Sequence, residues 1–491
     1  TMSLEAGTNA TRYIFLMLTA LLQTPSSLVS SSTHLASLSP CAARLAARSA
    51  LPLLNTSTRR LGFFNYPSRR MFATTSSAMA SSSMFEHIVE APPDPILGTA
   101  LAYKADTNPN KVNLGVGAYR TEEGATYVFP VVAKVDKELA AQTLDKEYLP
   151  IDGLPGLKKV TQKLLFGECA AYRGDRICSI QALSGTGALR VGAEFMNRHL
   201  PQDWGRTVYL SDPTWGNHKQ IFLAAGFAVK TYPYWDQARR CVDMDAMLHT
   251  LKFAPKHSII VLHGCAHNPT GLDPTKDEWQ QIVQVIKDNN LIPFIDTAYQ
   301  GYASGDLDED AYSLRLFESS GLEFFVAQSF AKNFGLYGER VGMFHIVASS
   351  AERAKVVLSQ VKPVVRAMYS NPPVHGGRIV ERILSDPTLF AEWQQQLKDV
   401  AARIHRVRSD LRGGLEAKGT PGSWEHITRQ IGMFSYTGLS VAQSERMIDQ
   451  WHIYMLKNGR ISLAGLNHKN IPYVVGAIDD CVRNAPGDSK L

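Results

Sequence analysis

HSIIVLHG (257–264) and LIPFIDT (291–297) decide the fold, because each is an apolar run of the length of a buried strand. Between them lies DPTKDEWQQIVQVIKDNN (273–290), whose apolar residues recur at helical spacing and whose acidic residues come early, where they favour a helix N-terminus. LEFFVAQSF (322–330) adds another buried strand. Strands that alternate with helices predict an α/β fold, with a mostly parallel sheet covered by helices on both faces.

Polar groups follow these strands at their carboxyl ends, where ligands collect in parallel sheets. LIPFID ends on Asp296, an acid that needs a cationic partner if it is buried and otherwise serves as a helix N-cap. Asn268 follows 257–264 in a proline–glycine turn. LEFFVAQSF leads to Lys332, and a lysine desolvated at a strand end becomes nucleophilic enough to condense with an aldehyde cofactor. The alternative is a strand followed by a basic loop.

Three further motifs offer groups for an anion or an aromatic ring. LSGTGALR (183–190) predicts a glycine turn before a helix, where Ser184, Thr186 and backbone N–H groups would bind a phosphate, and it lacks the lysine of a Walker loop. Ser329 and Arg340 flank Lys332 and suit the same anion. Trp215 in DPTWGNH offers a flat surface for stacking, although a core tryptophan is the more common case.

Composition bounds the class of protein. The 491 residues are 45% hydrophobic and 20% charged, as in ordinary globular proteins, and are long enough for two domains. The formal charge of +6 comes from arginines within residues 1–83, so the remaining chain is neutral and predicts no nucleic-acid partner. The six cysteines show no metal-ligand spacing, no metal is predicted, and no apolar run approaches the roughly 20 residues of a membrane span.

Residues 1–83 are rich in Ser, Ala, Leu and Arg, which is typical of a targeting leader that is disordered or absent in the working protein. A mitochondrial address is the first prediction. The apolar stretch YIFLMLTALL (13–22) leaves a two-step plastid route open. A cytosolic protein would follow if translation starts at Met71, Met79 or Met84.

Two other stretches carry local predictions. APPDPILG (91–98) is expected to be an extended arm. An apolar stripe from Trp393 to Leu415, at spacings of four and three, predicts one long helix that ends at Gly413–Gly414 and could join two domains.

Ten motifs in a fixed order then carry a resemblance that covers nearly all of residues 84–491. They are PPDPILG, NLGVGAYR, KEYLPI, LSGTGALR, PTWGNH, CAHNPTG, DTAYQGYASG, AQSFAKNFGLYGERVG, SNPP and NGRISLAGL. The chain resembles the class I aminotransferases that depend on pyridoxal 5'-phosphate, and within them the aspartate-specific branch. The residue before Lys332 is Ala331, where many relatives have serine, which removes a hydroxyl but no proposed catalytic group.

The resemblance implies fold type I of the pyridoxal-phosphate transferases, with a mostly parallel seven-stranded sheet in a large domain and a smaller α/β domain. It divides the chain into a leader (1–83), an N-terminal arm with part of the small domain (84–126), a large cofactor-binding domain (127–400) and a small C-terminal domain (401–491).

The resemblance also assigns roles. Lys332 would hold the cofactor and later transfer the proton, Asp296 would pair with the ring nitrogen, Tyr299 and Asn268 would bind the ring oxygen, and Trp215 would stack on the ring. Ser184, Gly185, Thr186, Ser329 and Arg340 would hold the phosphate, with Tyr148 of a partner subunit. For His218 and His263, a supporting role and a neutral core histidine remain equally open.

Substrate binding would rest on two arginines. Arg460 would bind the α-carboxylate, and Arg366 from the other subunit of a homodimer with shared sites would bind the side-chain carboxylate, since guanidinium groups fix carboxylates by paired hydrogen bonds. Gly117, Trp215 and Asn268 would also contact the substrate. The implied reaction moves the amino group of L-aspartate to 2-oxoglutarate by a ping-pong mechanism, with small dicarboxylic amino acids and 2-oxo acids as partners.

Overall fold

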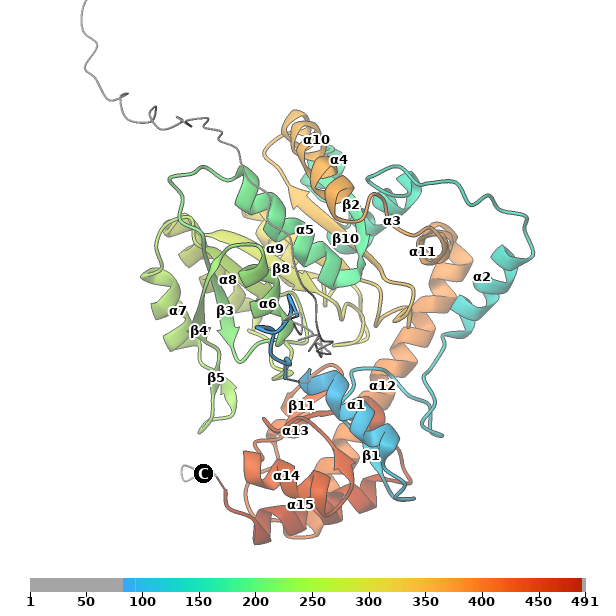
Figure 1. Ribbon diagram of the computed structural model, residues 1–491, viewed down its shortest axis with the longest axis vertical. Coiled ribbons are helices and arrows are strands. Elements are labelled where there is room, and N and C mark those ends of the chain that lie inside the picture. The colour runs from blue at the N-terminus through green and yellow to red at the C-terminus, as the bar shows by residue number, and fades with distance from the viewer. Residues whose placement is uncertain (1–82, 93, 488–491) are drawn as a thin grey trace, which may run out of the picture. The chain divides into compact units, whose positions relative to one another are not determined.

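The computed structural model describes residues 83–92 and 94–487 (Figure 1). The chain divides into two units, Thr1–His87 and Ile88–Leu491. In the first unit, the described residues 83–87 form one turn, closed by a hydrogen bond of 3.0 Å from the Glu86 N–H to the Ser83 carbonyl. The rest of the predicted leader, including the apolar stretch at 13–22, lies outside the described residues.

A seven-stranded sheet organises the second unit and confirms the predicted α/β fold. Its strand order is β2-β10-β9-β8-β7-β3-β4. Only β10 runs antiparallel to its neighbours, so the sheet is mostly parallel. The strands are β2 (Ile177–Leu183), β3 (Thr207–Asp212), β4 (Ala228–Pro233), β7 (Ile259–His263), β8 (Ile292–Thr297), β9 (Phe324–Ser329) and β10 (Val341–Val347).

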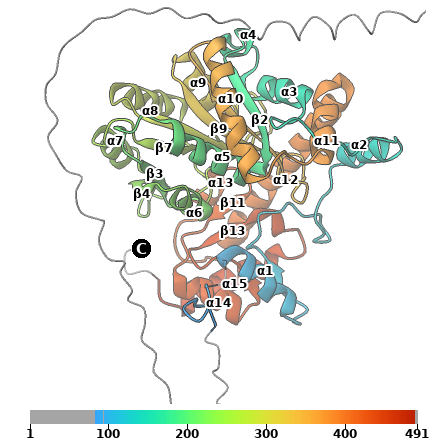
Figure 2. The ribbon, with the colours of Figure 1, turned by 45° about the horizontal axis from the view of Figure 1, so that its top comes forward.

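Helices cover both faces of this sheet, because successive strand residues point to opposite sides (Figures 1 and 2). On β8, for example, Phe294 joins an apolar cluster under α5, while Ile295 joins a second cluster on the other face. A Cβ on Gly192 of α5 would lie 2.7 Å from the ring of Phe294, so only glycine lets α5 pack this closely. The first face is covered by α5 (Ser184–His199), α6 (Asn217–Ala224) and α10 (Ala351–Met368), and the second by α7 (Met244–Lys252), α8 (Lys276–Asp288) and α9 (Tyr312–Ser319).

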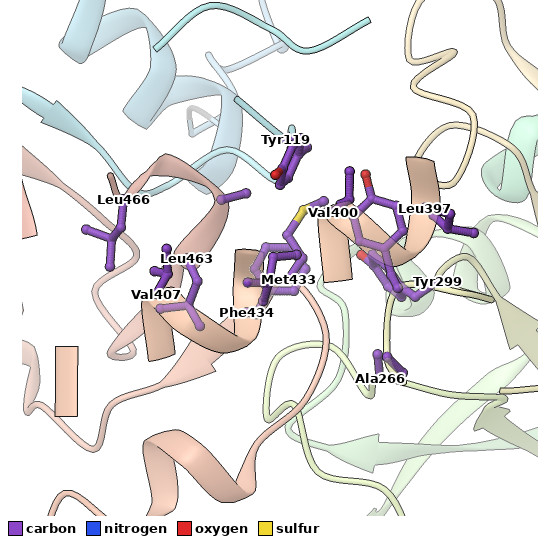
Figure 3. Packing of buried hydrophobic residues seen from close by; sticks show 14 of the residues in the cluster. Tyr119, Ala266, Tyr299, Leu397, Val400, Val407, Met433, Phe434, Leu463 and Leu466 are labelled. Atoms are coloured by element: carbon purple, nitrogen blue, oxygen red, sulfur yellow. The ribbon is translucent and has the colours of Figure 1, made fainter. Parts of the chain in front are cut away.

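The long helix α12 (Pro387–Ala417) carries the predicted apolar stripe, from Trp393 to Leu415. The predicted end at Gly413–Gly414 is wrong, because the helix continues to Ala417. Gly414 lies where α12 meets α15, and a Cβ there would be 2.8 Å from Val475, so this glycine serves close helix packing. Val400 and Val407 of α12 belong to the same apolar cluster as Met433 and Phe434 (Figure 3).

The C-terminal part of the chain packs with residues from its N-terminal part. Val112 pairs with Ile453 in a parallel ladder, and Tyr436 of β11 pairs with Arg460 of β13. The strands outside the large sheet are β1 (Val112–Asn113), β5 (Trp235–Asp236), β6 (Cys241–Val242), β11 (Phe434–Tyr436), β12 (Ile453–Tyr454) and β13 (Arg460–Ser462). The remaining helices are α1 (Pro95–Ala105), α2 (Pro130–Ala140), α3 (Pro155–Phe166), α4 (Ala170–Arg173), α11 (His375–Ser385), α13 (His426–Arg429), α14 (Val441–Asp449), α15 (Ile471–Asn484) and the 3-10 turn η1 (Leu463–Gly465).

The arm predicted at 91–98 is only partly extended. Asp94 caps α1 by accepting hydrogen bonds from the N–H groups of Ile96 and Leu97, and Pro95 takes the first helical turn, where its missing N–H costs nothing. The predicted extension is wrong from Pro95 onward, because a proline in the first turn of a helix is compatible with that helix. Within residues 83–92 and 94–487, no helix is long and apolar enough to cross a membrane.

Candidate functional site

A cavity of about 180 Å³ opens where β7, β8 and β9 end and α5 begins. This is the edge at which the sequence predicted a ligand site. The cavity brings together ten of the predicted residues and four others. The predicted ones are Ser184, Gly185, Thr186, Trp215, Asn268, Asp296, Tyr299, Ser329, Lys332 and Arg340, and the others are His263, Cys265, Ala298 and Ala331.

Lys332 lies in the turn after β9, with its side chain half-buried in the cavity wall. Its Nζ donates a hydrogen bond of 2.9 Å to the Gly117 carbonyl and lies 4.9 Å from the ring centroid of Tyr337. Burial, with the nearby positive charges of Arg460 and Arg340, lowers the pKa of Lys332 to about 8. A larger fraction of its amine is therefore neutral and nucleophilic at physiological pH than in an ordinary lysine.

Asp296 lies inside β8 rather than at a helix start, since the next helix, α9, begins at Tyr312. Its Oδ2 lies 2.9 Å from Nε2 of the fully buried His218. Thr214 Oγ1 lies 2.8 Å from the other nitrogen of that imidazole and 3.3 Å from His263 Nε2. The residue next to the carboxylate is therefore an imidazole whose two nitrogens are both engaged, and the other side of Asp296 faces the cavity.

Burial, together with the charges of His267 and His218, lowers the pKa of His263 well below its usual value. His263 is therefore neutral near pH 7. It accepts a hydrogen bond of 3.2 Å from the Asn268 N–H, which ties it to the turn that carries Asn268. For His263, this contact supports a structural role in the cavity wall.

Hydroxyl groups and backbone amides gather at the start of α5. Ser184 Oγ lies 2.9 Å from Ser329 Oγ, which also accepts a hydrogen bond of 3.2 Å from the Ala331 N–H. A Cβ on Gly185 would lie 3.3 Å from the Ser329 Cβ, so glycine keeps this corner open. The exposed Arg340 lines the same cavity and adds a positive charge. A helix N-terminus with hydroxyls and a guanidinium is suited to a phosphate group.

Arg460 is buried on β13, with its guanidinium held on three sides. One amino group donates to the Gly115 carbonyl at 2.6 Å and the other to Asn268 Oδ1 at 3.3 Å. Its Cζ lies 4.2 Å from the ring centroid of Phe434. Burial lowers the pKa of Arg460 to about 10, so the group stays positively charged at neutral pH. Together, these contacts hold a fixed cation beside Asn268.

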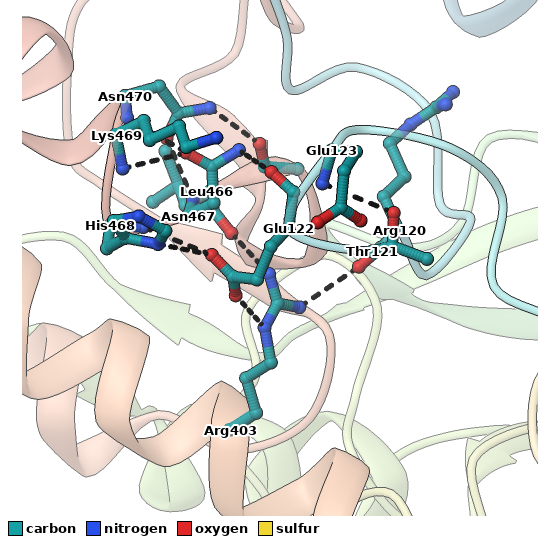
Figure 4. A network of polar contacts seen from close by, with 11 residues as sticks. Arg120, Thr121, Glu122, Glu123, Arg403, Leu466, Asn467, His468, Lys469 and Asn470 are labelled. Carbon is teal, nitrogen blue, oxygen red and sulfur yellow. Dashed lines mark hydrogen bonds and ion pairs between the residues drawn. The ribbon is translucent and has the colours of Figure 1, made fainter.

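The segment around Gly117 is fastened to the C-terminal part of the chain. Arg403 of α12 donates to Glu122 at 2.6 Å and to the Arg120 carbonyl at 3.1 Å, while His468 lies 2.8 Å from the same carboxylate (Figure 4). A Cβ on Gly117 would lie 2.8 Å from the ring of Phe434, so a larger residue would displace the segment from Lys332 and Arg460.

Tyr148 and Arg366 do not reach this cavity. They line a separate cavity of about 270 Å³ with Leu149, Ile151, Ser370 and Asn371. Tyr148 is 82% exposed, and the Arg366 guanidinium contacts the Ser370 hydroxyl. Within one chain, the structure therefore separates the two residues that the sequence assigned to a partner subunit from those assigned to the chain itself.

No role for Thr214, Tyr337 or Phe434 was predicted from the sequence. Thr214 bridges two histidines, Tyr337 lies beside the Lys332 amine and accepts a hydrogen bond of 2.9 Å from the Tyr119 N–H, and Phe434 stacks on Arg460. Thr214 and Tyr337 lie within quoted motifs and Phe434 lies outside them, but a lone threonine or aromatic residue carries no signal without its partners in space.

The residues of the cavity fit the predicted cofactor, which combines a ring nitrogen, an aldehyde and a phosphate ester. Asp296 offers a carboxylate for a protonated ring nitrogen, and Lys332 offers an amine with a lowered pKa for the aldehyde. The start of α5, with Ser329 and Arg340, offers donors for the phosphate. In the described part of the chain, no group of three or more His, Cys, Asp or Glu residues could hold a metal ion.

Comparisons with known proteins show the family to which the chain belongs. The family model for aminotransferase class I and II matches residues 109–478. The cytoplasmic aspartate aminotransferase of Oryza sativa subsp. japonica is 51% identical over 82% of this chain and 99% of its own length. Some other matching relatives carry chloroplastic or mitochondrial names. This chain therefore belongs to the class I and II aminotransferase family.

Solved structures show the same similarity in three dimensions. The cytoplasmic aspartate aminotransferase of Saccharomyces cerevisiae matches with a TM-score of 0.79 and 44% identity, over 82% of this chain and 99% of that one. An aromatic-amino-acid aminotransferase of Burkholderia pseudomallei, covalently bound to pyridoxal phosphate, matches with a TM-score of 0.79 and 43% identity, over 82% of this chain and 100% of that one.

Proposed function

We propose that this protein is an aspartate aminotransferase that uses pyridoxal 5'-phosphate to move the amino group of L-aspartate to 2-oxoglutarate. The observation that carries the proposal is the juxtaposition of Lys332, Asp296 and the start of α5 in one cavity, with Arg460 beside Asn268. When bound, the cofactor supplies a carbonyl that takes up the amino group and a ring that withdraws electrons from the substrate Cα.

In the proposed reaction, each residue of the cavity binds, orients or moves a proton. Asp296, oriented by His218, holds a positive charge at the ring nitrogen. Arg460 fixes the α-carboxylate through paired hydrogen bonds, and so sets the orientation of the Cα–H bond. Lys332 Nζ carries the proton that leaves Cα, a task that its lowered pKa suits. Tyr299 and Asn268 bind the ring oxygen, and Trp215 supports the ring.

The shared site of a homodimer is part of the same proposal. Tyr148 would reach the phosphate and Arg366 the side-chain carboxylate of substrate bound in the neighbouring subunit. The support is that both residues lie together in a cavity that excludes Lys332, and that neither lines the cavity of its own chain. The proposed domains remain an N-terminal arm with part of the small domain (84–126), a large cofactor-binding domain (127–400) and a small C-terminal domain (401–491).

Steady-state transamination of aspartate, tyrosine and kynurenine tests the substrate. We expect kcat/KM for aspartate to exceed that for either aromatic substrate, because Arg366 offers a cation to a second carboxylate. The alternative is an aromatic aminotransferase, and the similarity to the Burkholderia aromatic-amino-acid aminotransferase supports this alternative. A higher kcat/KM for tyrosine would replace the first proposal with the second.

A mitochondrial location completes the proposal and rests on the composition of residues 1–83. Fluorescent fusions of the whole chain and of the chain from Met84 test it. We expect only the whole chain to enter mitochondria, whereas plastid or cytosolic fluorescence of the whole chain would contradict this address.

A further inference from the structure

Gln181 is a fully buried polar residue on β2, three positions before Ser184. Its neighbours Ile180 and Ala182 face the apolar cluster under α5, so the Gln181 side chain points to the opposite face of the sheet. A buried primary amide is costly unless its oxygen and its N–H groups find partners, so the identity of those partners is informative.

Its partners belong to two segments that are far apart in the sequence. Oε1 accepts a hydrogen bond of 3.1 Å from the Leu154 N–H, and Nε2 donates one of 2.9 Å to the Pro373 carbonyl. The Gln181 backbone N–H donates to the Asp152 carbonyl at 3.1 Å. One glutamine therefore joins the chain at 152–154 to the chain at 373.

Two glycines make this junction tight. Gly153 has a φ of +86°, and a Cβ on it would lie 2.2 Å from the Gln181 Cβ. A Cβ on Gly377, at the start of α11, would lie 2.9 Å from Gln181 Nε2. The side chain is thus enclosed from both segments, and its amide has one way to satisfy both hydrogen bonds.

The two joined segments are those that form the second cavity. Tyr148 and Ile151 come from the first, and Arg366 and Ser370 from the second. The Tyr369 hydroxyl also donates to the Gln181 carbonyl, at 3.4 Å. Another link from the first segment is the ion pair of the buried Asp152 with the partly exposed Lys362 of α10, at 3.2 Å, and the same carboxylate also pairs with Lys158.

We infer that Gln181 is a positioning residue that sets the spacing of Tyr148 and Arg366 and thereby acts on the site of the partner subunit. The inference rests on the proposed function, because it requires a homodimer in which these two residues complete the neighbouring site. Gln181 touches neither cofactor nor substrate, so its effect passes through the two segments that it holds.

The variant Gln181→Met keeps the side-chain size and removes both hydrogen bonds. We expect the KM for aspartate and 2-oxoglutarate to rise roughly 10- to 100-fold, because small displacements of a positioning group cost that much. The KM for tyrosine should change less, and the dissociation constant of the cofactor should rise, since Tyr148 would be displaced from the phosphate. A merely structural role would lower the melting temperature without this selectivity.

Gln162→Met is the matched control. Gln162 is buried on α3 and donates to Ser179 Oγ at 2.7 Å and to the Ile177 carbonyl at 3.0 Å, but it touches neither segment. We expect it to lower thermal stability and to leave the ratio of aspartate to tyrosine activity unchanged. A similar loss of selectivity in both variants would overturn the inference.

Heterodimers decide whether Gln181 acts across the interface. In one dimer, Lys332→Ala and Gln181→Met lie in the same subunit, and the other subunit is wild type. The wild-type subunit then holds the only working lysine, and its site receives Tyr148 and Arg366 from the subunit in which Gln181 is replaced. In the other dimer, one subunit carries Lys332→Ala and the other carries Gln181→Met. The working lysine then lies in the Gln181→Met subunit, and its site receives Tyr148 and Arg366 from a subunit that keeps Gln181. We expect a raised KM in the first dimer and a KM close to wild type in the second.

A reference dimer of wild-type and Lys332→Ala subunits separates two failures. If the reference is active, the reverse order of KM values would show that Gln181 acts within its own subunit, and equal KM values would show that it does not act across the interface. Either result contradicts the inference. If the wild-type protein is a monomer or does not transaminate, the proposed function fails, and the inference fails with it.

Discussion

The cavity that contains Lys332 and the cavity that contains Tyr148 and Arg366 differ in how many of their polar side chains have partners within the chain. The first is lined by strand ends and a helix start. Asp296 in its wall has a partner in His218, and the neighbouring Arg460 has one in Asn268. The second is a surface cavity, with a tyrosine that is 82% exposed and an exposed arginine whose guanidinium contacts the Ser370 hydroxyl. The contrast fits the proposal that one chain builds the reactive centre itself, whereas Tyr148 and Arg366 complete the site of a second copy.

The largest effect should come from the reactive centre. Lys332→Ala removes both the amine for the cofactor and the proton carrier, so we expect turnover to fall by at least about 10⁴-fold. Steady-state transamination and the absorbance of the bound cofactor measure the loss. Lys134→Ala, which removes an exposed ion pair with Glu392, is the control and should be silent. Retained transamination in Lys332→Ala would contradict the assignment.

Asp296→Asn should have the next largest effect. The change preserves shape but removes the negative charge that would hold a proton on the ring nitrogen, so we expect kcat to fall roughly 10²- to 10³-fold with little change in KM. His218→Asn, which changes only the group that orients Asp296, should cost less. An equal or larger loss in His218→Asn would show that the imidazole, rather than the carboxylate, carries the function.

Much of this centre was visible in the sequence, because each group follows a short apolar strand. Asp296 and Lys332 stand at ends of neighbouring parallel strands, and parallel strands bring their carboxyl ends to one edge. Phe434 and Gly115, by contrast, surround Arg460 from distant segments, and nothing in their local pattern indicates that contact. The predicted helix end at Gly414 was wrong because this glycine allows close packing of two helices, which is a tertiary effect, and does not end the helix.

Substitutions at Arg460 and Arg366 test the two carboxylate sites separately. Arg460→Lys should raise the KM for every amino acid, roughly 10- to 100-fold, because all of them share the α-carboxylate that the guanidinium fork would bind. Arg366→Ala should lower kcat/KM for aspartate about 10- to 100-fold more than for tyrosine, the range expected for loss of a charged hydrogen bond. A substrate panel measures both. Equal losses for aspartate and tyrosine in Arg366→Ala would show that Arg366 does not select dicarboxylates.

The smallest effect concerns the cavity of Lys332 alone, and it is the pH dependence of cofactor uptake. Since burial and two arginines lower the pKa of Lys332 to about 8, the neutral amine is present in about a tenth of the molecules at pH 7 and in most of them at pH 9. The rate at which cofactor-free protein takes up pyridoxal phosphate should therefore rise about tenfold between these pH values and level off above pH 9. An amine with the ordinary value of 10.5 would give a rise of about a hundredfold with no plateau, because its neutral fraction keeps growing over that range. Stopped-flow absorbance of the uptake distinguishes the two, and a profile without a plateau would show that the cavity leaves Lys332 as basic as a lysine in water.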